Sequence, residues 1–355
     1  MRVLSRVVVK VPTKITIAGE HAVVYGVPAV AAAIPRFILI TMSLRSDNRI
    51  VVETQGLYAR LSRVALDRSS DSVESLASED DARRALSYVT TALRLCEEFL
   101  GVGERGYDVY IESDLPASIG LGTSAAISVG TIAGCLKLRG GDPEEYRVRV
   151  AELGWRTELE VQGAASPMDT FTTALGGIRY IDPGAGSVDR IATWIAPAKP
   201  IPLVVGYTPR RGTTAELVAK VRRLRSSAPQ LFDRVMEVIG DIANAIRRAI
   251  EVGDLELLGR LVTVNHGLLE ALGVVDREHS LIIHSLLEAG ALGAKTSGAG
   301  SGGAFLAIAP SADKAGEIAI VAKGLGATVV ATGIYPRGFS VEGQRPRPRP
   351  RSSLS

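Results

Sequence analysis

The sequence predicts an α+β fold that is divided into two domains. A chain of 355 residues is long for a single hydrophobic core. Strand-like and helix-like segments are mixed in both halves, so neither half is all-α or all-β. Three prolines crowd into residues 194–202, which favours an extended linker there. We therefore expect an N-terminal domain over 1–195, a C-terminal domain over 196–341 and a disordered tail over 342–355.

The composition is that of a globular enzyme, with 46% hydrophobic and 22% charged residues. A formal net charge of +3 is too small to indicate nucleic-acid binding, and no apolar run reaches the length of about 18 residues that spans a bilayer. Charged residues interrupt the apolar N-terminal run, so we expect no signal peptide and a cytoplasmic protein. Cys96 and Cys135 lie among apolar residues in helix-like segments and are expected to be buried free thiols.

Runs rich in Val, Ile and Thr predict the strands of the N-terminal half. These strands are expected at 3–10, 13–18, 29–43, 49–53 and 107–112. Apolar residues at helical spacing, and Pro143 in a first turn, predict its helices. The helices are expected at 81–100, 123–138 and 143–161. Residues 56–80 carry many Ser and Asp and are expected to form a loop with some helix, and glycines punctuate short strands near 176–184.

The same two patterns predict the elements of the C-terminal half. Helices are expected at 213–225, 228–251, 254–272, 276–289 and 311–325. Strands are expected at 203–207, at 328–334 and around a glycine-rich loop that begins after Lys295. The Arg-Pro repeat over 345–351 predicts an extended, solvated tail, and contact with an acidic partner is the alternative.

The most informative segment is a loop of small residues over 116–126, which reads PASIGLGTSAA between a predicted strand and a predicted helix. Gly120 and Gly122 let the backbone approach a phosphate closely. The first N–H groups of the helix have no intrahelical partner and favour an anion, and the Ser124 hydroxyl can reach a metal ion beside the phosphates. A plain strand-to-helix turn is the alternative. We expect the loop to bind phosphate through Pro116, Ala117, Ser118, Ile119, Gly120, Leu121, Gly122, Thr123, Ser124, Ala125 and Ala126.

Two further segments accompany this loop. Residues 11–26 read VPTKITIAGEHAVVYG, and residues 295–304 read KTSGAGSGGA. In this order and spacing, the three motifs resemble those of the superfamily of galactokinase, homoserine kinase, mevalonate kinase and phosphomevalonate kinase. Within it, the opening GEHAVVYG over 19–26 is similar to that of mevalonate kinases, and ELEVQGAASPMDT over 158–170 is similar to their archaeal branch. The resemblance covers residues 5–335.

The resemblance implies a ribosomal-protein-S5-like N-terminal domain and a ferredoxin-like C-terminal domain, with the active site in the cleft between them. It implies transfer of a phosphoryl group from ATP to the C5 hydroxyl of mevalonate, with Mg²⁺ as a cofactor, and it leaves a homodimer open. A sibling kinase that acts on phosphomevalonate or on another hydroxyl of mevalonate is the nearest alternative, against which the GEHAVV opening argues. A non-catalytic ligand sensor is a more distant alternative. Such a protein would be expected to lose some catalytic residues, whereas this chain retains all four candidates: Lys14, Ser124, Glu158 and Asp169.

A phosphoryl-transfer site needs a phosphate cradle, a divalent metal, a group that positions or deprotonates the acceptor, and positive charge. By the resemblance, Asp169 is the general base for the C5 hydroxyl, and its motif is expected to form a loop. From the residues alone, Asp169 could instead cap the next segment. Lys14 lies within an apolar strand, where an ammonium needs an anionic partner, and Asp169 and the substrate oxygen are the expected partners. A lysine that snorkels from an edge strand is the alternative.

By the resemblance, Glu158 and Ser124 hold Mg²⁺, which prefers oxygen ligands and usually takes one or two carboxylates. Glu160 is the rival ligand, but it lies about 200° round the helix from Glu158, so both cannot face the site. From the residues alone, a solvated helix face is the alternative for Glu158.

The resemblance places the remaining substrate contacts in two motifs. His21 is expected to shape the mevalonate pocket by contact with the mevalonate carboxylate. Ser297 keeps the hydroxyl of a threonine that is common in the family, whereas Ser301 stands where a glycine is usual. Ser301 therefore adds a Cβ where the loop is expected to need a positive φ. The substrate-binding residues are expected to be Lys14, Glu20, His21, Asp169 and Ser297.

Overall fold

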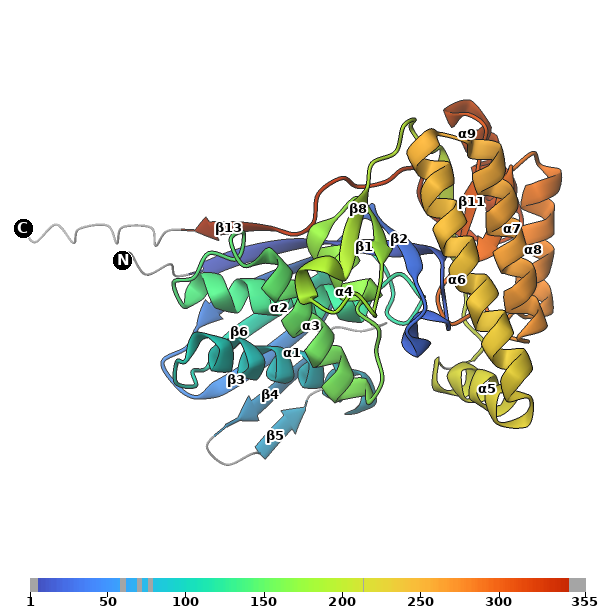
Figure 1. Ribbon diagram of the computed structural model, residues 1–355. Helices are drawn as coiled ribbons and strands as arrows, with labels where there is room; N and C mark the ends of the chain where they lie inside the picture. The colour runs from blue at the N-terminus through green and yellow to red at the C-terminus, as the bar shows by residue number, and fades with distance from the viewer. Residues whose placement is uncertain (1–5, 58–61, 69–71, 76–78, 213, 345–355) are drawn as a thin grey trace, which may run out of the picture.

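The structure is a computed structural model, which describes residues 6–57, 62–68, 72–75, 79–212 and 214–344. It confirms the predicted α+β fold and the division into two domains, which lie side by side (Figure 1). Among the described residues, the N-terminal domain is built on a nine-stranded sheet and the C-terminal domain on a four-stranded sheet.

The large sheet has the strand order β13-β1-β2-β6-β3-β4-β5, and β7 and β8 extend it beside one half of β2. Its strands are β1 (Arg6–Ala18), β2 (Ala29–Leu44), β3 (Arg49–Gln55), β4 (Ser62–Asp67), β5 (Ser72–Ser75), β6 (Tyr107–Ser113), β7 (Ile178–Ile181), β8 (Ala192–Ile195) and β13 (Ser340–Gln344). β2 pairs with β7 through its first half and with β6 through its second half, while β1 runs antiparallel along its other edge. The long strands β1 and β2 thus form the centre of the domain.

The burial of β1 shows where the two domains meet. Its first half alternates between buried and more exposed residues, as expected for a strand with one solvated face. From Val11 onward every residue of β1 is buried. Ile15 and Ile17 belong to a hydrophobic cluster that also contains Ile246 and Leu306 of the C-terminal domain. This shared core fixes the arrangement of the domains around the end of β1.

Four helices cover one face of the large sheet (Figure 1): α1 (Glu79–Leu100), α2 (Thr123–Leu138), α3 (Arg147–Gln162) and α4 (Met168–Leu175). Nearly every residue of α2 is buried, because this helix lies between the sheet and helices α1 and α3. Two glycines permit the close contact with the sheet. A Cβ at Gly130 would lie 2.6 Å from Ile40 Cδ1, and a Cβ at Gly134 would lie 2.4 Å from Met42 Sδ.

The C-terminal domain combines a small antiparallel sheet with five helices among its described residues. Its strands follow the order β10-β11-β9-β12: β9 (Leu203–Thr208), β10 (Gly293–Thr296), β11 (Gly303–Ile308) and β12 (Thr328–Ala331). Its helices are α5 (Thr214–Ser227), α6 (Pro229–Val252), α7 (Leu255–Ala271), α8 (Arg277–Glu288) and α9 (Ala312–Gly324). Side chains of Asp254, Asp276 and Ser311 accept backbone hydrogen bonds at the starts of α7, α8 and α9, which explains why these helices begin where they do.

Residues 56–80 differ from the prediction of a loop with some helix. Their described parts contain two antiparallel strands, β4 and β5, which continue the sheet beyond β3. The Ser-rich and Asp-rich composition masked these strands, because short strands at a sheet edge need few apolar residues. Of β4, Val64 is buried and packs into the core of the N-terminal domain.

The bounds of one strand and the start of one helix also differ from the prediction. The strands predicted at 3–10 and 13–18 are one strand, β1, with an irregularity in its pairing between Pro12 and Thr13. The helix predicted to start at Pro143 starts at Arg147, because Pro143 lies in the turn before α3.

Strand β13 is an element that the sequence pattern did not predict. It pairs antiparallel with β1, so that Gln344 lies opposite Arg6 and Ser340 opposite Lys10. The predicted boundary at 341/342 is therefore corrected: Ser340–Gln344 completes the sheet of the N-terminal domain, and residues 342–344 are strand rather than tail. Residues 345–355, which include the Arg-Pro repeat, lie outside the described residues.

The cysteines and the helices agree with the composition of the chain. Cys96 and Cys135 are buried free thiols, as predicted. Within the described ranges, none of the helices combines the length and the apolar character needed to cross a bilayer.

Candidate active site

A cavity of about 550 Å³ opens between the two domains, and all the predicted motifs contribute to its wall. The first motif contributes Lys14, Glu20 and His21, and the third contributes Gly298 and Ala299. From the glycine loop come Pro116, Ala117, Ser118, Gly120, Gly122, Thr123 and Ser124, and from the fourth segment come Glu158, Gln162, Met168 and Asp169. Residues far apart in the sequence therefore meet at one site.

The glycine loop needs its glycines for their backbone conformation. Gly120 and Gly122 have φ angles of 89° and 74°, in the left-handed region that favours glycine. A Cβ at Gly122 would lie 2.9 Å from Cγ of Lys14, so glycine here also makes room for that side chain. The first intrahelical hydrogen bond of α2 runs from Ala126 N to Gly122 O, which leaves the preceding N–H groups without a partner inside the helix.

Only part of the predicted phosphate-binding loop faces the cavity. Ile119 and Leu121 belong to the hydrophobic cluster that joins the domains, and Ala125 and Ala126 are buried within α2. None of these four residues is among those that line the cavity. The loop thus alternates between residues that anchor it and residues that face the cavity.

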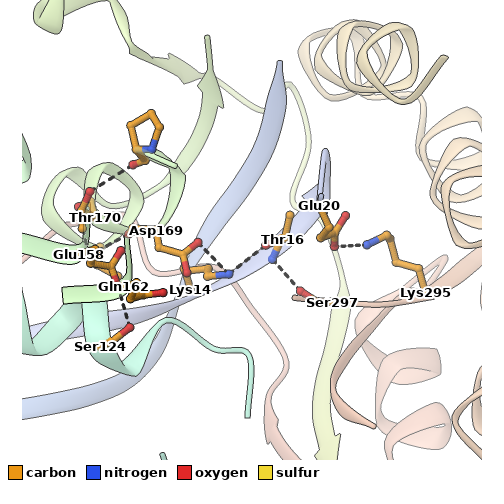
Figure 2. Close-up of polar contacts among 12 residues, drawn as sticks. Lys14, Thr16, Glu20, Ser124, Glu158, Gln162, Asp169, Thr170, Lys295 and Ser297 are labelled. Atoms are coloured by element: carbon orange, nitrogen blue, oxygen red, sulfur yellow. Dashed lines mark hydrogen bonds and ion pairs between the residues drawn. The ribbon is translucent and has the colours of Figure 1, made fainter. Parts of the chain in front are cut away.

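Lys14 and Asp169 lie together, as the sequence predicted. Nζ of Lys14 is 3.0 Å from Oδ1 of Asp169 and donates a hydrogen bond of 3.0 Å to Oγ1 of Thr16 (Figure 2). The Lys14 side chain is only 2% exposed, whereas that of Asp169 is 27% exposed and faces the cavity. Asp169 lies in the first turn of α4, not in the predicted loop, because the helix starts directly after Pro167.

Glu158 and Ser124 form a second polar pair beside the first. Oγ of Ser124 donates a hydrogen bond of 2.7 Å to Oε1 of Glu158, and Gln162 contacts the same oxygen at 3.3 Å (Figure 2). Burial, and next the negative charge of Asp169, raises the pKa of the Glu158 carboxyl to about 8. Glu160 points elsewhere, to an exposed ion pair with Arg94. Glu158 therefore faces the cavity and its rival does not.

His21 and Glu20 form the side of the cavity nearest the C-terminal domain. His21 has a φ of 61°, and its Nε2 lies 3.1 Å from the carbonyl oxygen of Ala299. Burial lowers the pKa of His21 to about 4, so the ring is neutral at pH 7. Glu20 is buried and forms an ion pair with Lys295 of β10.

The third motif holds the two domains together around the cavity. Ser297 is buried and does not line the cavity, since its Oγ accepts a hydrogen bond of 3.0 Å from the backbone N–H of Thr16. Ala304 N donates to Ile119 O at 2.8 Å, which joins the motif to the glycine loop. Ser301 has a φ of 53°, the positive value expected at a position where glycine is usual.

Two arginines that the sequence analysis missed also line the cavity. Arg84 comes from α1, and Arg210 comes from the segment between β9 and α5. Arg210 donates to the carbonyl oxygens of Ser118 at 3.0 Å and Gly300 at 3.3 Å. Burial, and next the positive charge of Arg84, lowers the pKa of Arg210. No motif surrounds either arginine, so only the tertiary structure shows that they meet.

The chain is similar to known proteins over most of its length. The models of the GHMP kinase N-terminal and C-terminal domains match residues 87–177 and 246–320. A mevalonate kinase of Thermococcus sibiricus is 38% identical over 344 residues, which are 95% of this chain and 98% of that protein. A mevalonate kinase of Pyrococcus furiosus is 35% identical, with the same coverage of both chains.

Solved structures of mevalonate kinases are also similar to this chain. The Methanococcus jannaschii mevalonate kinase matches with a TM-score of 0.71 and 24% identity, over 92% of this chain and 98% of that one. The L. major mevalonate kinase in complex with R-mevalonate matches with a TM-score of 0.71 and 25% identity, over 93% and 96% of the two chains.

Proposed function

Since the chain belongs to the mevalonate kinases of the GHMP kinase family, we propose that the cavity between its domains is where ATP phosphorylates the C5 hydroxyl of mevalonate. One observation carries this assignment of the site. The Lys14–Asp169 ion pair lies in the same cavity as the Ser124–Glu158 pair and the glycine loop. A phosphate cradle, an acceptor-activating carboxylate and a fixed positive charge are the parts that phosphoryl transfer needs.

The phosphates of ATP are assigned to the glycine loop and to the first turn of α2. The unpartnered N–H groups there, together with the helix dipole, favour an anion at this place. Arg84 adds positive charge at the same cavity. Because Arg210 contacts both the glycine loop and the third motif, it links phosphate binding to the C-terminal domain.

Ser124 and Glu158 are the residues that would hold Mg²⁺. Glu158 is buried and retains a proton to about pH 8, and a cation in this place would substitute for that proton. Within the described ranges, no cluster of three or more Asp, Glu, His or Cys residues is arranged to hold a metal ion. This fits Mg²⁺, which usually takes one or two carboxylates and completes its shell with phosphates and water. When bound, Mg²⁺ would neutralise charge on the ATP phosphates.

Asp169 and Lys14 are assigned to the acceptor hydroxyl. The Asp169 carboxylate accepts the hydroxyl proton as the oxygen attacks phosphorus. Lys14 orients that carboxylate through the ion pair and offers positive charge to the oxygens of the transferred group. Ser297 acts through Thr16 rather than on the substrate, since it holds the strand that carries Lys14.

His21 is assigned to a hydroxyl of mevalonate. The carbonyl oxygen of Ala299 can only accept a hydrogen bond, so Nε2 of the neutral ring carries the proton. Nδ1 is then an acceptor, which suits a hydroxyl and not the carboxylate expected from the sequence. The carboxylate of mevalonate is assigned instead to Arg210, whose guanidinium lies at the same side of the cavity and interacts electrostatically with His21.

A substrate panel tests the proposed function. Initial rates of ADP formation are measured with ATP and, in turn, mevalonate, phosphomevalonate, galactose and homoserine. We expect the highest kcat/KM with mevalonate, and product NMR to show the phosphate on C5. Faster turnover of a sibling substrate would reassign the reaction. Binding of ATP and mevalonate with no ADP formed would favour a ligand sensor.

The Mg²⁺ concentration for half-maximal rate is expected to fall as pH rises toward about 8, and to level off above it. Below its raised pKa the Glu158 carboxyl holds a proton that Mg²⁺ must displace, so acid weakens metal binding. Glu158→Gln removes both the charge and the titration. The variant is therefore expected to need much more Mg²⁺ and to lose the pH dependence, as measured by Mg²⁺ titrations of the initial rate from about pH 6.5 to about pH 9.

Glu160→Gln is the matched control, because Glu160 lies on the same helix and pairs with Arg94 outside the cavity. It is expected to leave the Mg²⁺ requirement unchanged at every pH. If Glu160→Gln shifts the requirement and Glu158→Gln does not, the metal ligand is misassigned by about half a helical turn.

A further inference from the structure

The proposed substrate site contains a buried ion pair that joins the two domains. Lys295 of β10 is 0% exposed, and its Nζ contacts Oε1 of Glu20, which is 2% exposed (Figure 2). The same Nζ donates a hydrogen bond of 2.6 Å to the carbonyl oxygen of Thr296. Glu20 lies just beyond the end of β1 in the N-terminal domain, so this contact spans 275 residues of sequence.

The two oxygens of the Glu20 carboxylate have different surroundings. Oε1 is occupied by Lys295, whereas Oε2 is buried and has no hydrogen-bond partner among the described residues. A buried carboxylate oxygen without a partner is costly, and Glu20 lines the cavity assigned to mevalonate. Oε2 has almost no accessible surface in this orientation, so a hydroxyl of a bound substrate would supply the missing donor after a small rotation of the carboxylate toward the cavity.

The residue next to Lys295, Thr296, is held in place by two histidines of the C-terminal domain. The backbone N–H of Thr296 donates to Nδ1 of His266 at 3.4 Å, and the Thr296 hydroxyl lies 3.2 Å from Nδ1 of His279. Burial lowers the pKa of both histidines to about 4, so they are neutral supports at pH 7. The carbonyl that Lys295 contacts is thus fixed by α7 and α8, and Lys295 in turn is fixed against Glu20.

We propose that Lys295 is a positioning residue for the acceptor substrate: it holds the charge and the orientation of Glu20 so that Oε2 accepts a hydrogen bond from a mevalonate hydroxyl. This inference rests on the proposed function. Lys295 touches neither substrate nor ATP, since it does not line the cavity, and it acts only through Glu20. Its loss should therefore weaken mevalonate binding much more than ATP binding.

The decisive variant is Lys295→Met, which keeps a long apolar stem and removes the charge. We expect the KM for mevalonate to rise at least tenfold, while the KM for ATP changes less than about twofold and kcat falls less than the KM rises. Lys314→Met is the matched control, because Lys314 lies in the same domain and pairs with Glu317 on the surface. The control is expected to keep wild-type constants.

A pH profile separates positioning from a merely structural role. Without Lys295, the buried Glu20 carboxylate loses the positive charge that stabilises its ionised form, so the mevalonate KM of Lys295→Met should fall as pH rises. The other groups that face the pair are Lys14, His21, His266 and His279. Glu270 and Asp276 interact in turn with His266 and His279. The three histidines have pKa values of about 4 and remain neutral across a profile from about pH 6 to about pH 9.

A double variant keeps the proposal falsifiable if Lys295→Met folds poorly. Glu20→Gln with Lys295→Met removes the stranded charge, so thermal stability is expected to recover while the mevalonate KM stays high and loses its pH dependence. A double variant with wild-type KM would overturn the proposal, as would equal increases in both KM values in Lys295→Met. Failure of the proposed function is distinguishable, because the unmodified enzyme would then not phosphorylate mevalonate.

Discussion

Asp169→Asn is expected to lower kcat by about 10²–10⁴-fold and to leave the affinity for ATP nearly unchanged. Asn has the shape of Asp but cannot take the proton of the acceptor hydroxyl. The change leaves the buried Lys14 ammonium without its anionic partner, although the Asn oxygen and the Thr16 hydroxyl can still accept its hydrogen bonds, so some loss of thermal stability is expected beside the loss of kcat. Steady-state rates at saturating mevalonate give kcat, and calorimetric titration gives the dissociation constant of ATP.

The control for this variant is Asp189→Asn, which changes an exposed aspartate of the same domain outside the cavity. It is expected to match the wild type in both measurements. Turnover of Asp169→Asn close to the wild-type value would remove Asp169 from the role of base. A large loss of ATP affinity would show that the residue organises the phosphate site instead.

Lys14→Met is expected to lower kcat by about 10²–10³-fold, the usual effect of removing one fixed donor from a transition-state charge. It should also weaken ATP binding, because the ammonium lies beside the glycine loop, where Gly122 makes room for its side chain. Met fills the space of the buried lysine stem, and the partner Asp169 can be hydrated from the cavity. The melting temperature should therefore remain near the wild-type value, as measured by scanning calorimetry alongside kcat.

Lys10→Met is the matched control, since Lys10 lies on the same strand, is exposed and stacks its ammonium over the ring of Phe37. Its kcat should be unchanged. An active Lys14→Met variant would mean that Arg84 supplies the charge at the transferred group. A Lys14→Met variant that unfolds would instead assign the lysine to the stability of β1.

Elements whose own residues show a clear periodicity and a clear start could be predicted from the sequence. Helix α2 has the predicted bounds, because a glycine loop precedes it and its apolar pattern is continuous. Local chemistry also predicted that Lys14, in an apolar strand, needs an anionic partner, while the resemblance to the kinase family pointed to Asp169 as a site residue.

Features that depend on distant pairing could not be predicted from local pattern. β13 contains few apolar residues, and only the exposed edge of β1 makes it a strand. The direction of the Ser297 hydroxyl was equally hidden, because its partner is a backbone N–H in the other domain. Arg84 and Arg210 do not belong to any recognisable motif. They come from different domains, so they line one cavity only because the two domains pack together.

The position of β13 has a consequence for the folding of the chain during its synthesis. A ribosome releases the N-terminal domain first, and such domains commonly fold as they emerge. Here the sheet of that domain lacks the edge strand β13 until the chain beyond α9 has been made. Until then, the backbone groups of β1 that pair with β13 have no partner strand. An open edge of this kind invites pairing with other chains. The nascent enzyme is therefore expected to be most prone to aggregation before β13 is translated.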